Sequence, residues 1–202
     1  MLRTARTAAV LLTASLVALG ATACTSGTDD SVATAAKSTT GGSTAGKSGT
    51  DESGGAGEQG APEKKAPAKV GDTIALKGMD TRADVTVLKV VDKAKGADEY
   101  TEPDKGKRFV AVQFRIKNTG SKAYQDSPSN GAKVVDTEGQ GFDADYSDTD
   151  AGPAFPADVT IAPGGTAKGF ITFQVPKAAK LDTVQFGLDS GFADQTGQWN
   201  VR

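Results

Sequence analysis

Hydrophobic and polar residues alternate along the last two thirds of the chain. In the stretch RFVAVQFRIKNTG (108–120), Val110, Val112, Phe114 and Ile116 share one parity. Small or polar residues occupy the other parity. A period of two indicates a strand that buries one face. We therefore predict a half-buried strand that ends at a turn formed by Asn-Thr-Gly.

The stretch GFITFQVP (169–176) repeats this pattern. It places Ile171, Phe173 and Val175 on the predicted inner face and Thr172 on the outer face. The proline at its end cannot donate a hydrogen bond to a neighbouring strand, so it is expected to end the strand.

Shorter segments suggest further strands, and none shows the 3.6-residue period of an amphipathic helix. These segments are TIAL (73–76), DVTVLKVV (84–91), TVQFGL (183–188) and QWNVR (198–202), while KVVDTEGQGF (133–142) suggests a strand, a turn and a second strand. About seven short strands separated by turn residues predict an all-β domain, an antiparallel β-sandwich.

The first 23 residues have the order of a secretory signal peptide. Two arginines precede an apolar run at residues 8–19, and small residues follow at 20–23. The run is shorter than the roughly 20 apolar residues that a membrane-spanning helix needs. The pattern therefore predicts a signal peptide over residues 1–23, with an uncleaved anchor helix as the alternative.

Cys24, the only cysteine in 202 residues, follows directly. The segment Ala21-Thr22-Ala23-Cys24 resembles the lipobox of bacterial lipoproteins, although Ala21 stands where leucine is commonest. The resemblance implies lipidation of Cys24, and hence a protein attached to the extracellular face of the membrane by its acylated N-terminus. A secreted protein with an incidental cysteine is the alternative. A single cysteine allows no internal disulfide.

Residues 24–69 differ in composition from the rest of the chain. Between residues 25 and 69, 30 of 45 residues are Gly, Ser, Thr or Ala, and Val32 is the only large apolar residue. Such a segment buries too little apolar surface to offset the entropy of ordering, so we predict a lipidated, disordered tether. All twelve aromatic residues lie further along, and we assign residues 70–202 to one folded domain.

Charge and residue types exclude several functions. The predicted domain has 16 lysines and arginines against 19 aspartates and glutamates, which argues against nucleic acid as a partner and predicts no basic lipid-binding surface. The chain has no histidine, so it has neither a Ser-His-Asp triad nor a histidine metal ligand. We therefore expect no enzyme, no catalytic residue, no bound metal and no cofactor.

The acidic stretch DADYSDTD (143–150) is a candidate calcium loop. Asp143, Asp145 and Ser147 match the first three ligand positions of an EF-hand loop, but the glycine and the final glutamate of that loop are missing. We favour a solvated acidic loop over a calcium site or a pair of glycosidase carboxylates.

Two further features are weaker candidates. The mixed-charge stretch 100–108 is interpreted as a solvated turn. Trp199 is either a core residue, which we favour, or an exposed residue that stacks on a sugar.

Three segments, 106–120, 133–142 and 161–176, together resemble a bacterial extracellular family, domain of unknown function 4352. The shared turn and strand-end positions are Gly106, Asn118, Gly139, Pro163, Gly164, Gly169 and Pro176. The resemblance implies an immunoglobulin-like sandwich, similar to that of a secreted immunoprotective antigen, behind a lipoprotein signal peptide. It carries over no catalytic residue.

These features predict a membrane-anchored extracellular lipoprotein that acts as a non-catalytic binding or interaction module of the cell envelope. Its partner would be an envelope protein or a cell-wall ligand. The alternative is a structural protein that maintains the envelope without a tight ligand. A calcium-dependent adhesion module or a carbohydrate-active module is the third hypothesis.

Overall fold

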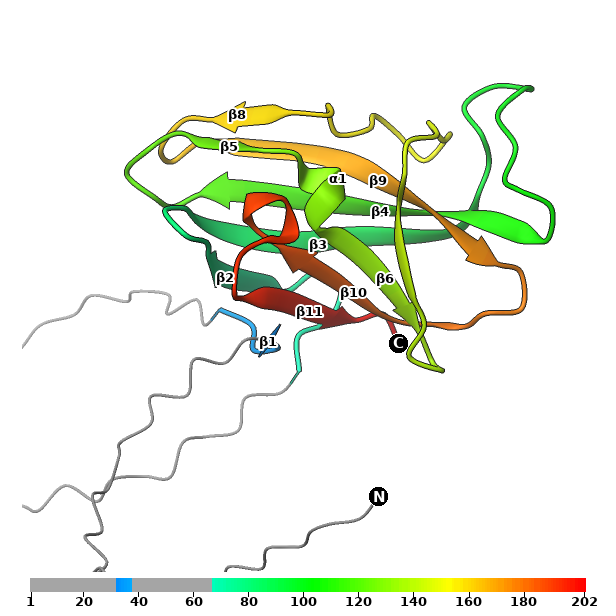
Figure 1. Ribbon diagram of the computed structural model, residues 1–202, viewed down its shortest axis with the longest axis horizontal. Coiled ribbons are helices and arrows are strands. Elements are labelled where there is room, and N and C mark those ends of the chain that lie inside the picture. The colour runs from blue at the N-terminus through cyan, green and yellow to red at the C-terminus, as the bar shows by residue number, and fades with distance from the viewer. Residues whose placement is uncertain (1–31, 38–66) are drawn as a thin grey trace, which may run out of the picture.

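The computed structural model describes residues 32–37 and 67–202, which form a two-layered β-sandwich (Figure 1). The strands are β1 (Val32–Ala33), β2 (Thr73–Lys77), β3 (Arg82–Ala94), β4 (Lys107–Asn118), β5 (Tyr124–Asp126), β6 (Ala132–Asp136), β7 (Gly141–Asp145), β8 (Val159–Ile161), β9 (Thr166–Pro176), β10 (Leu181–Gly187) and β11 (Thr196–Asn200). Two short helices accompany them, α1 (Pro128–Gly131) and the 3₁₀ helix η1 (Asp189–Gly191). Neither of these helices has the length or apolar character needed to cross a membrane. The architecture confirms the predicted fold class.

One continuous sheet makes both layers, because β7 passes from one layer to the other. The strand order is β1-β11-β10-β6-β7-β9-β4-β3-β2. The first half of β7 pairs with β6, while Ala144 and Asp145 pair with β9. Strands β1, β11, β10 and β6 therefore form one layer, and β9, β4, β3 and β2 form the other. A small ribbon of β5 and β8 lies beside β9 (Figure 1).

The core lies between the layers and consists of the inward side chains that the alternation predicts. Phe114 on β4 and Phe186 on β10 meet across the layers with ring centroids 5.2 Å apart. Phe173 and Trp199 are also fully buried, so the prediction that Trp199 is a core residue is confirmed. The Trp199 Nε1 donates to the Asp72 carbonyl at 2.9 Å, which satisfies its one polar group.

Part of the predicted outer face is buried. Ala111 and Thr172 were expected to face solvent, and for both the expectation is wrong. Phe109 and Phe170, which share their parity, are buried as well. Gly152, at a φ of +143°, lies so close to Phe170 that an added Cβ would come within 2.8 Å of the ring. A distant loop thus covers this end of the sheet, and alternation along a strand carries no information about such a cover.

Residues 32–37 differ from the predicted tether. Strand β1 pairs in parallel with β11, the Lys37 amide donates to the Thr73 carbonyl, and the Ala68 amide donates to the Thr34 carbonyl. The assignment of all of residues 24–69 to the tether is therefore wrong for this segment. Docking on a strand edge uses backbone hydrogen bonds, which do not require the large apolar side chains on which the prediction was based. The signal peptide and Cys24 lie outside the described residues.

The predicted turn after β4 also holds the small ribbon. The Asn118 Nδ2 donates to the carbonyls of Lys122 and Ile161, and its Oδ1 accepts from the Gly120 amide. Strands β5 and β8 have three residues each, too few to show a period in the sequence. One buried side chain therefore joins β8 and the segment leading into β5 to the end of β4.

Single substitutions in adjacent strand positions test the assignment of faces. Phe114→Ala should lower the free energy of unfolding by about 3–5 kcal/mol, because it leaves a cavity in the core. Gln113→Ala should change it by roughly 0.5 kcal/mol or less. Thr172→Ala should cost about 1 kcal/mol, because the loop covers its methyl group. Thermal melts measure all three, and a Gln113→Ala protein that melts below Phe114→Ala would contradict the assignment.

Hydrogen exchange tests the docking of residues 32–37. The amides of Lys37 and Ala68 should exchange more slowly than that of Glu102 in an exposed loop, because each donates to a carbonyl of another segment. Limited proteolysis should likewise spare residues 32–37. Exchange at Lys37 as fast as at Glu102 would show that the segment does not dock in solution.

Candidate functional site

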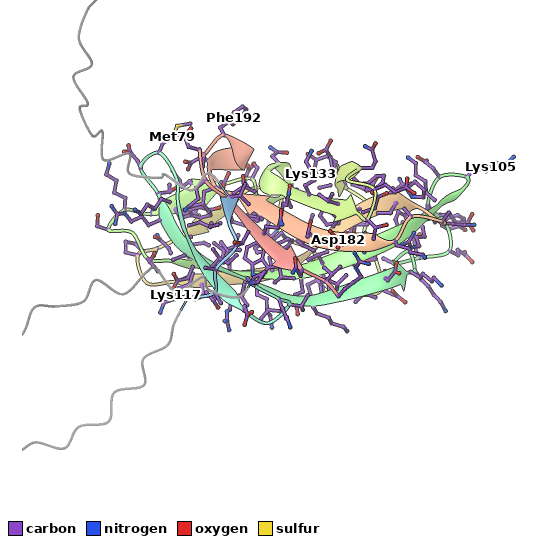
Figure 2. The ribbon with its side chains drawn as sticks, turned by 90° about the horizontal axis from the view of Figure 1, so that it is seen from below. Met79, Lys105, Lys117, Lys133, Asp182 and Phe192 are labelled. Carbon is purple, nitrogen blue, oxygen red and sulfur yellow. The ribbon has the colours of Figure 1, made fainter. Side chains whose placement is uncertain are left out.

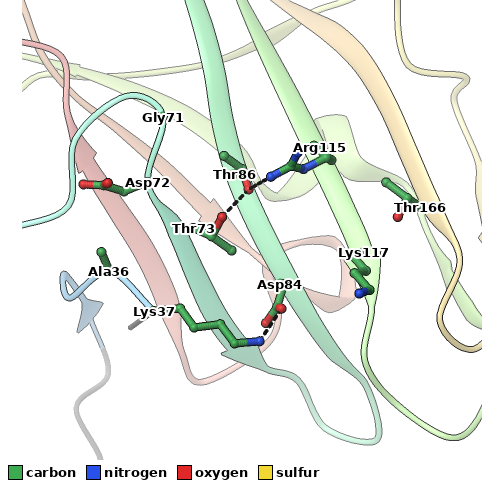
Figure 3. Close-up of a pocket in the computed structure, with 10 residues that line it drawn as sticks. All are labelled: Ala36, Lys37, Gly71, Asp72, Thr73, Asp84, Thr86, Arg115, Lys117 and Thr166. Atoms are coloured by element: carbon green, nitrogen blue, oxygen red, sulfur yellow. Dashed lines mark hydrogen bonds and ion pairs between the residues drawn. The ribbon is translucent and has the colours of Figure 1, made fainter. Parts of the chain in front are cut away.

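A polar pocket of about 500 Å³ opens on the outer side of β2, β3 and β4, where the docked segment crosses the edge of the sheet (Figure 3). Its lining includes hydroxyl, carboxylate and basic side chains, together with Ala36 and Gly71. The lining residues are Ala36, Lys37, Gly71, Asp72, Thr73, Asp84, Thr86, Arg115, Lys117 and Thr166. The segment from the predicted tether thus supplies one wall of the pocket.

One row of side chains crosses three strands at the floor of the pocket. Thr73 pairs with Thr86, and Thr86 pairs with Arg115. The two threonine hydroxyls lie 2.7 Å apart, and the Arg115 Nη2 donates to the Thr86 Oγ1 at 3.2 Å. This bond is the one that the Arg115 side chain makes within the described residues, so most of its five N–H donors remain available to a ligand.

The next row contains two further charged residues of the pocket, and Asp72 lies outside both rows. Asp84 on β3 lies opposite Lys117 on β4, which lies opposite Thr166 on β9. The Asp84 carboxylate pairs with the Lys37 Nζ of the docked segment at 2.5 Å (Figure 3). Lys117 forms no ion pair among the described residues. The pocket can therefore offer uncompensated positive charge and hydroxyl groups to an anion.

The carboxylates of the acidic candidate stretch bond to protein groups. Asp143 pairs with Lys133 at 2.8 Å, and the Asp145 Oδ2 accepts from the Gln174 Nε2 at 2.8 Å. Partial burial raises the pKa of Asp145, but hydrogen bonds from Ser147 and Gln174 outweigh it and hold that pKa below its ordinary value. The described part of the chain contains no group of three acidic or cysteine side chains that could hold a metal ion. The stretch therefore does not form the arrangement of an EF-hand loop.

The mixed-charge loop begins with an exposed aromatic residue. The Tyr100 side chain is exposed, and the Asp98 carboxylate accepts from the amides of Tyr100 and Thr101. A further hydrogen bond from the Thr101 hydroxyl is the main cause that lowers the pKa of Asp98. This arrangement is a local turn, as the sequence predicts for this loop.

A second polar cluster was not predicted. Asp189 and Ser190 have φ values of 54° and 56°, a left-handed conformation that costs energy in residues other than glycine. The Asp126 Oδ1 accepts from both the amide and the hydroxyl of Ser190. Its Oδ2 accepts from Tyr124, whose pKa is raised by burial and by this carboxylate. These residues are far apart in the sequence, so no local pattern could reveal them.

The two layers, the buried aromatic core and the docked first strand define an immunoglobulin-like β-sandwich domain. The chain belongs to the DUF4352 family, a domain of unknown function, whose profile matches residues 69–196. The match covers most of the folded part and confirms the family resemblance seen in the sequence. The family description names no ligand or reaction, so a function has to be argued from this chain's own residues.

A curated relative and two solved structures are similar to parts of the chain. The YxkC protein of Bacillus subtilis (strain 168), described as uncharacterized, is 33% identical over 78 residues, which are 38% of this chain and 41% of that protein. The yjhA protein of Bacillus subtilis has a TM-score of 0.47 at 15% identity, over 67% of this chain and 99% of that one. MPT63, a secreted protein from Mycobacterium tuberculosis, has a TM-score of 0.47 at 15% identity, over 66% of this chain and 95% of that one.

Calcium titration tests the interpretation of the acidic stretch. Because Lys133 and Gln174 occupy the carboxylates of Asp143 and Asp145, added calcium should leave the melting temperature unchanged relative to a chelator. A calcium-dependent rise in melting temperature that Asp145→Asn abolishes would contradict this interpretation.

Proposed function

We propose that the protein is a membrane-anchored extracellular lipoprotein whose folded domain is a non-catalytic binding module of the cell envelope. The observation that carries the anchor is the order of the N-terminal residues: two arginines, a short apolar run, small residues and then Cys24. The two or three lipid chains of a lipoprotein bury enough CH₂ groups for stable attachment.

The polar pocket supports the binding role. It presents Arg115 and Lys117 beside threonine hydroxyls on a rigid sheet, which positions hydrogen-bond donors without further ordering. The sequence contains no histidine, and Asp143 and Asp145 are bonded to other side chains. A surface of fixed donors is suited to recognition.

The docked segment also supports a location close to the membrane. Between Cys24 and Val32 the chain has eight residue steps, which span at most about 28 Å. A lipid on Cys24 would therefore hold the domain within that reach for as long as β1 stays paired with β11. Residues 38–66 follow the docked segment along the chain, so their length adds nothing to this distance.

Fractionation of cells tests the anchor. Cys24→Ser should move the protein from the membrane fraction to the medium, or leave the signal peptide uncleaved, because serine cannot form the thioether to the lipid. The control Ser26→Ala changes a neighbouring hydroxyl and should leave the protein in the membrane fraction. Equal amounts of wild type and Cys24→Ser in the detergent phase would show that the anchor assignment is wrong.

The released Cys24→Ser protein also tests the binding role. It should sediment with isolated cell-envelope fragments and be displaced by excess unlabelled protein, as expected for a saturable site. An acidic control protein of similar size should remain in the supernatant. If the Cys24→Ser protein sediments with no envelope fraction, the binding role is contradicted. This result would not affect the assignment of the anchor.

A further inference from the structure

Basic side chains gather on the outer side of one layer, at the end that the loop around Gly152 does not cover. They occupy outward positions of β2, β3, β4 and β9, and all of them are exposed. They are Lys77, Arg82, Lys89, Arg115, Lys117 and Lys168, and we call them the basic face. None of the six forms an ion pair with any described residue, whereas Lys107, Arg108 and Lys133 elsewhere each do.

The docked segment completes this charge pattern. Asp84 is the one acidic residue at the outward positions of these four strands, and Lys37 neutralises it. The whole chain has a formal charge of −2, so its charge is strongly polarised. The net charge of the domain does not reveal this basic face, because a net balance does not show where the charges lie.

Two pairs of basic residues occupy directly opposite positions on neighbouring strands. Lys77 on β2 lies opposite Arg82 on β3, and Arg115 on β4 lies opposite Lys168 on β9. Directly opposite side chains have their Cβ atoms about 4.5–5.5 Å apart, and like charges there destabilise a sheet. An anion between the two members of a pair would replace repulsion by attraction. This arrangement is suited to a bound anion and is unfavourable without one.

We propose that the basic face binds an extended soluble polymer that carries repeated phosphate groups; this inference rests on the proposed function as a binding module. The two pairs lie on different strands of one layer, where neighbouring strands are spaced by about 4.8 Å, so several phosphates of one chain can be bound at once. The Arg115 guanidinium and the partly exposed Thr73 hydroxyl supply hydrogen bonds to phosphate oxygens beside the charge, while the buried Thr86 hydroxyl holds these two side chains in place.

The same face argues against two other anionic partners. The exposed large apolar side chains of the described residues are Val32, Val70, Met79, Tyr100, Tyr146 and Phe192, and none of them lies on these four strands. The strands of the face therefore carry no apolar side chain to insert into a bilayer, and Met79 lies outside them in the turn between β2 and β3. It also has no exposed aromatic ring on which a nucleic acid base could stack.

Binding on the basic face should be linked to the docking of residues 32–37. Lys37 removes the one negative charge from the face, so the docked state has the higher affinity for a polyanion. By reciprocity, the polyanion stabilises the docked state. Hydrogen exchange at the Lys37 amide should therefore slow when the polymer is added, an effect that non-specific attraction elsewhere would not produce.

Calorimetric titration of the Cys24→Ser full-length chain with long-chain inorganic polyphosphate tests the proposal. Arg115→Gln combined with Lys168→Gln should weaken binding at least about tenfold and flatten the dependence on salt concentration. The matched control, Lys105→Gln combined with Lys177→Gln, removes the same charge outside the basic face and should weaken binding less than about threefold. Figure 2 shows Lys105 at the opposite end of the domain from Lys117.

A thermal melt separates lost binding from lost folding. The Arg115→Gln and Lys168→Gln double variant should melt at or above the temperature of the parent chain, because it removes a repulsive pair. The proposal would be overturned if the double variant melted below the parent chain and the control pair weakened polyphosphate binding as much as the double variant does.

Two further outcomes would also overturn the proposal. The first is binding to vesicles of phosphatidylglycerol and phosphatidylcholine without binding to polyphosphate, which would assign the basic face to a membrane surface. The second is a protein that does not bind polyphosphate but still sediments with envelope fragments. In that case the proposal fails and the proposed function stands.

Discussion

Burial of apolar side chains between the two layers is the interaction on which the rest of the structure depends. The only cysteine is Cys24, so no disulfide joins the layers. Contacts such as that of Phe114 with Phe186 must hold them together. Each strand of both layers must therefore present apolar residues at alternate positions, and β7 must cross between the layers to close one side of the core.

Because the inward side chains form the core, the outward side chains of the same strands are not needed for it. On β4 and β9, one half of the outer side is nevertheless buried beneath the loop around Gly152, and the other half is exposed and basic. Arg115 and Lys117 thus lie on a rigid platform whose stability comes from the opposite side of the same strands. Such an arrangement allows a binding surface to be electrostatically unfavourable while the fold remains stable.

The open edge of the sandwich connects the fold to the proposed anchor. Strand β11 carries Trp199 on its inner side, and its outer edge pairs with β1 from the region next to Cys24. The segment that would hold the domain near the membrane also supplies Lys37, which neutralises Asp84. With the proposed anchor, one docking event would therefore set both the distance of the domain from the membrane and the charge of the basic face.

The sequence by itself determined the fold class, the longer strands and their inner residues, because strand alternation is a local property that burial enforces at each position. Phe114, Phe173 and Trp199 are inside as their patterns predict. Tertiary structure alone decided the burial of Thr172, the docking of residues 32–37 and the pairing of Arg115 with Lys168. Each of these depends on which distant segments become neighbours, and neither composition nor periodicity along the chain contains that information.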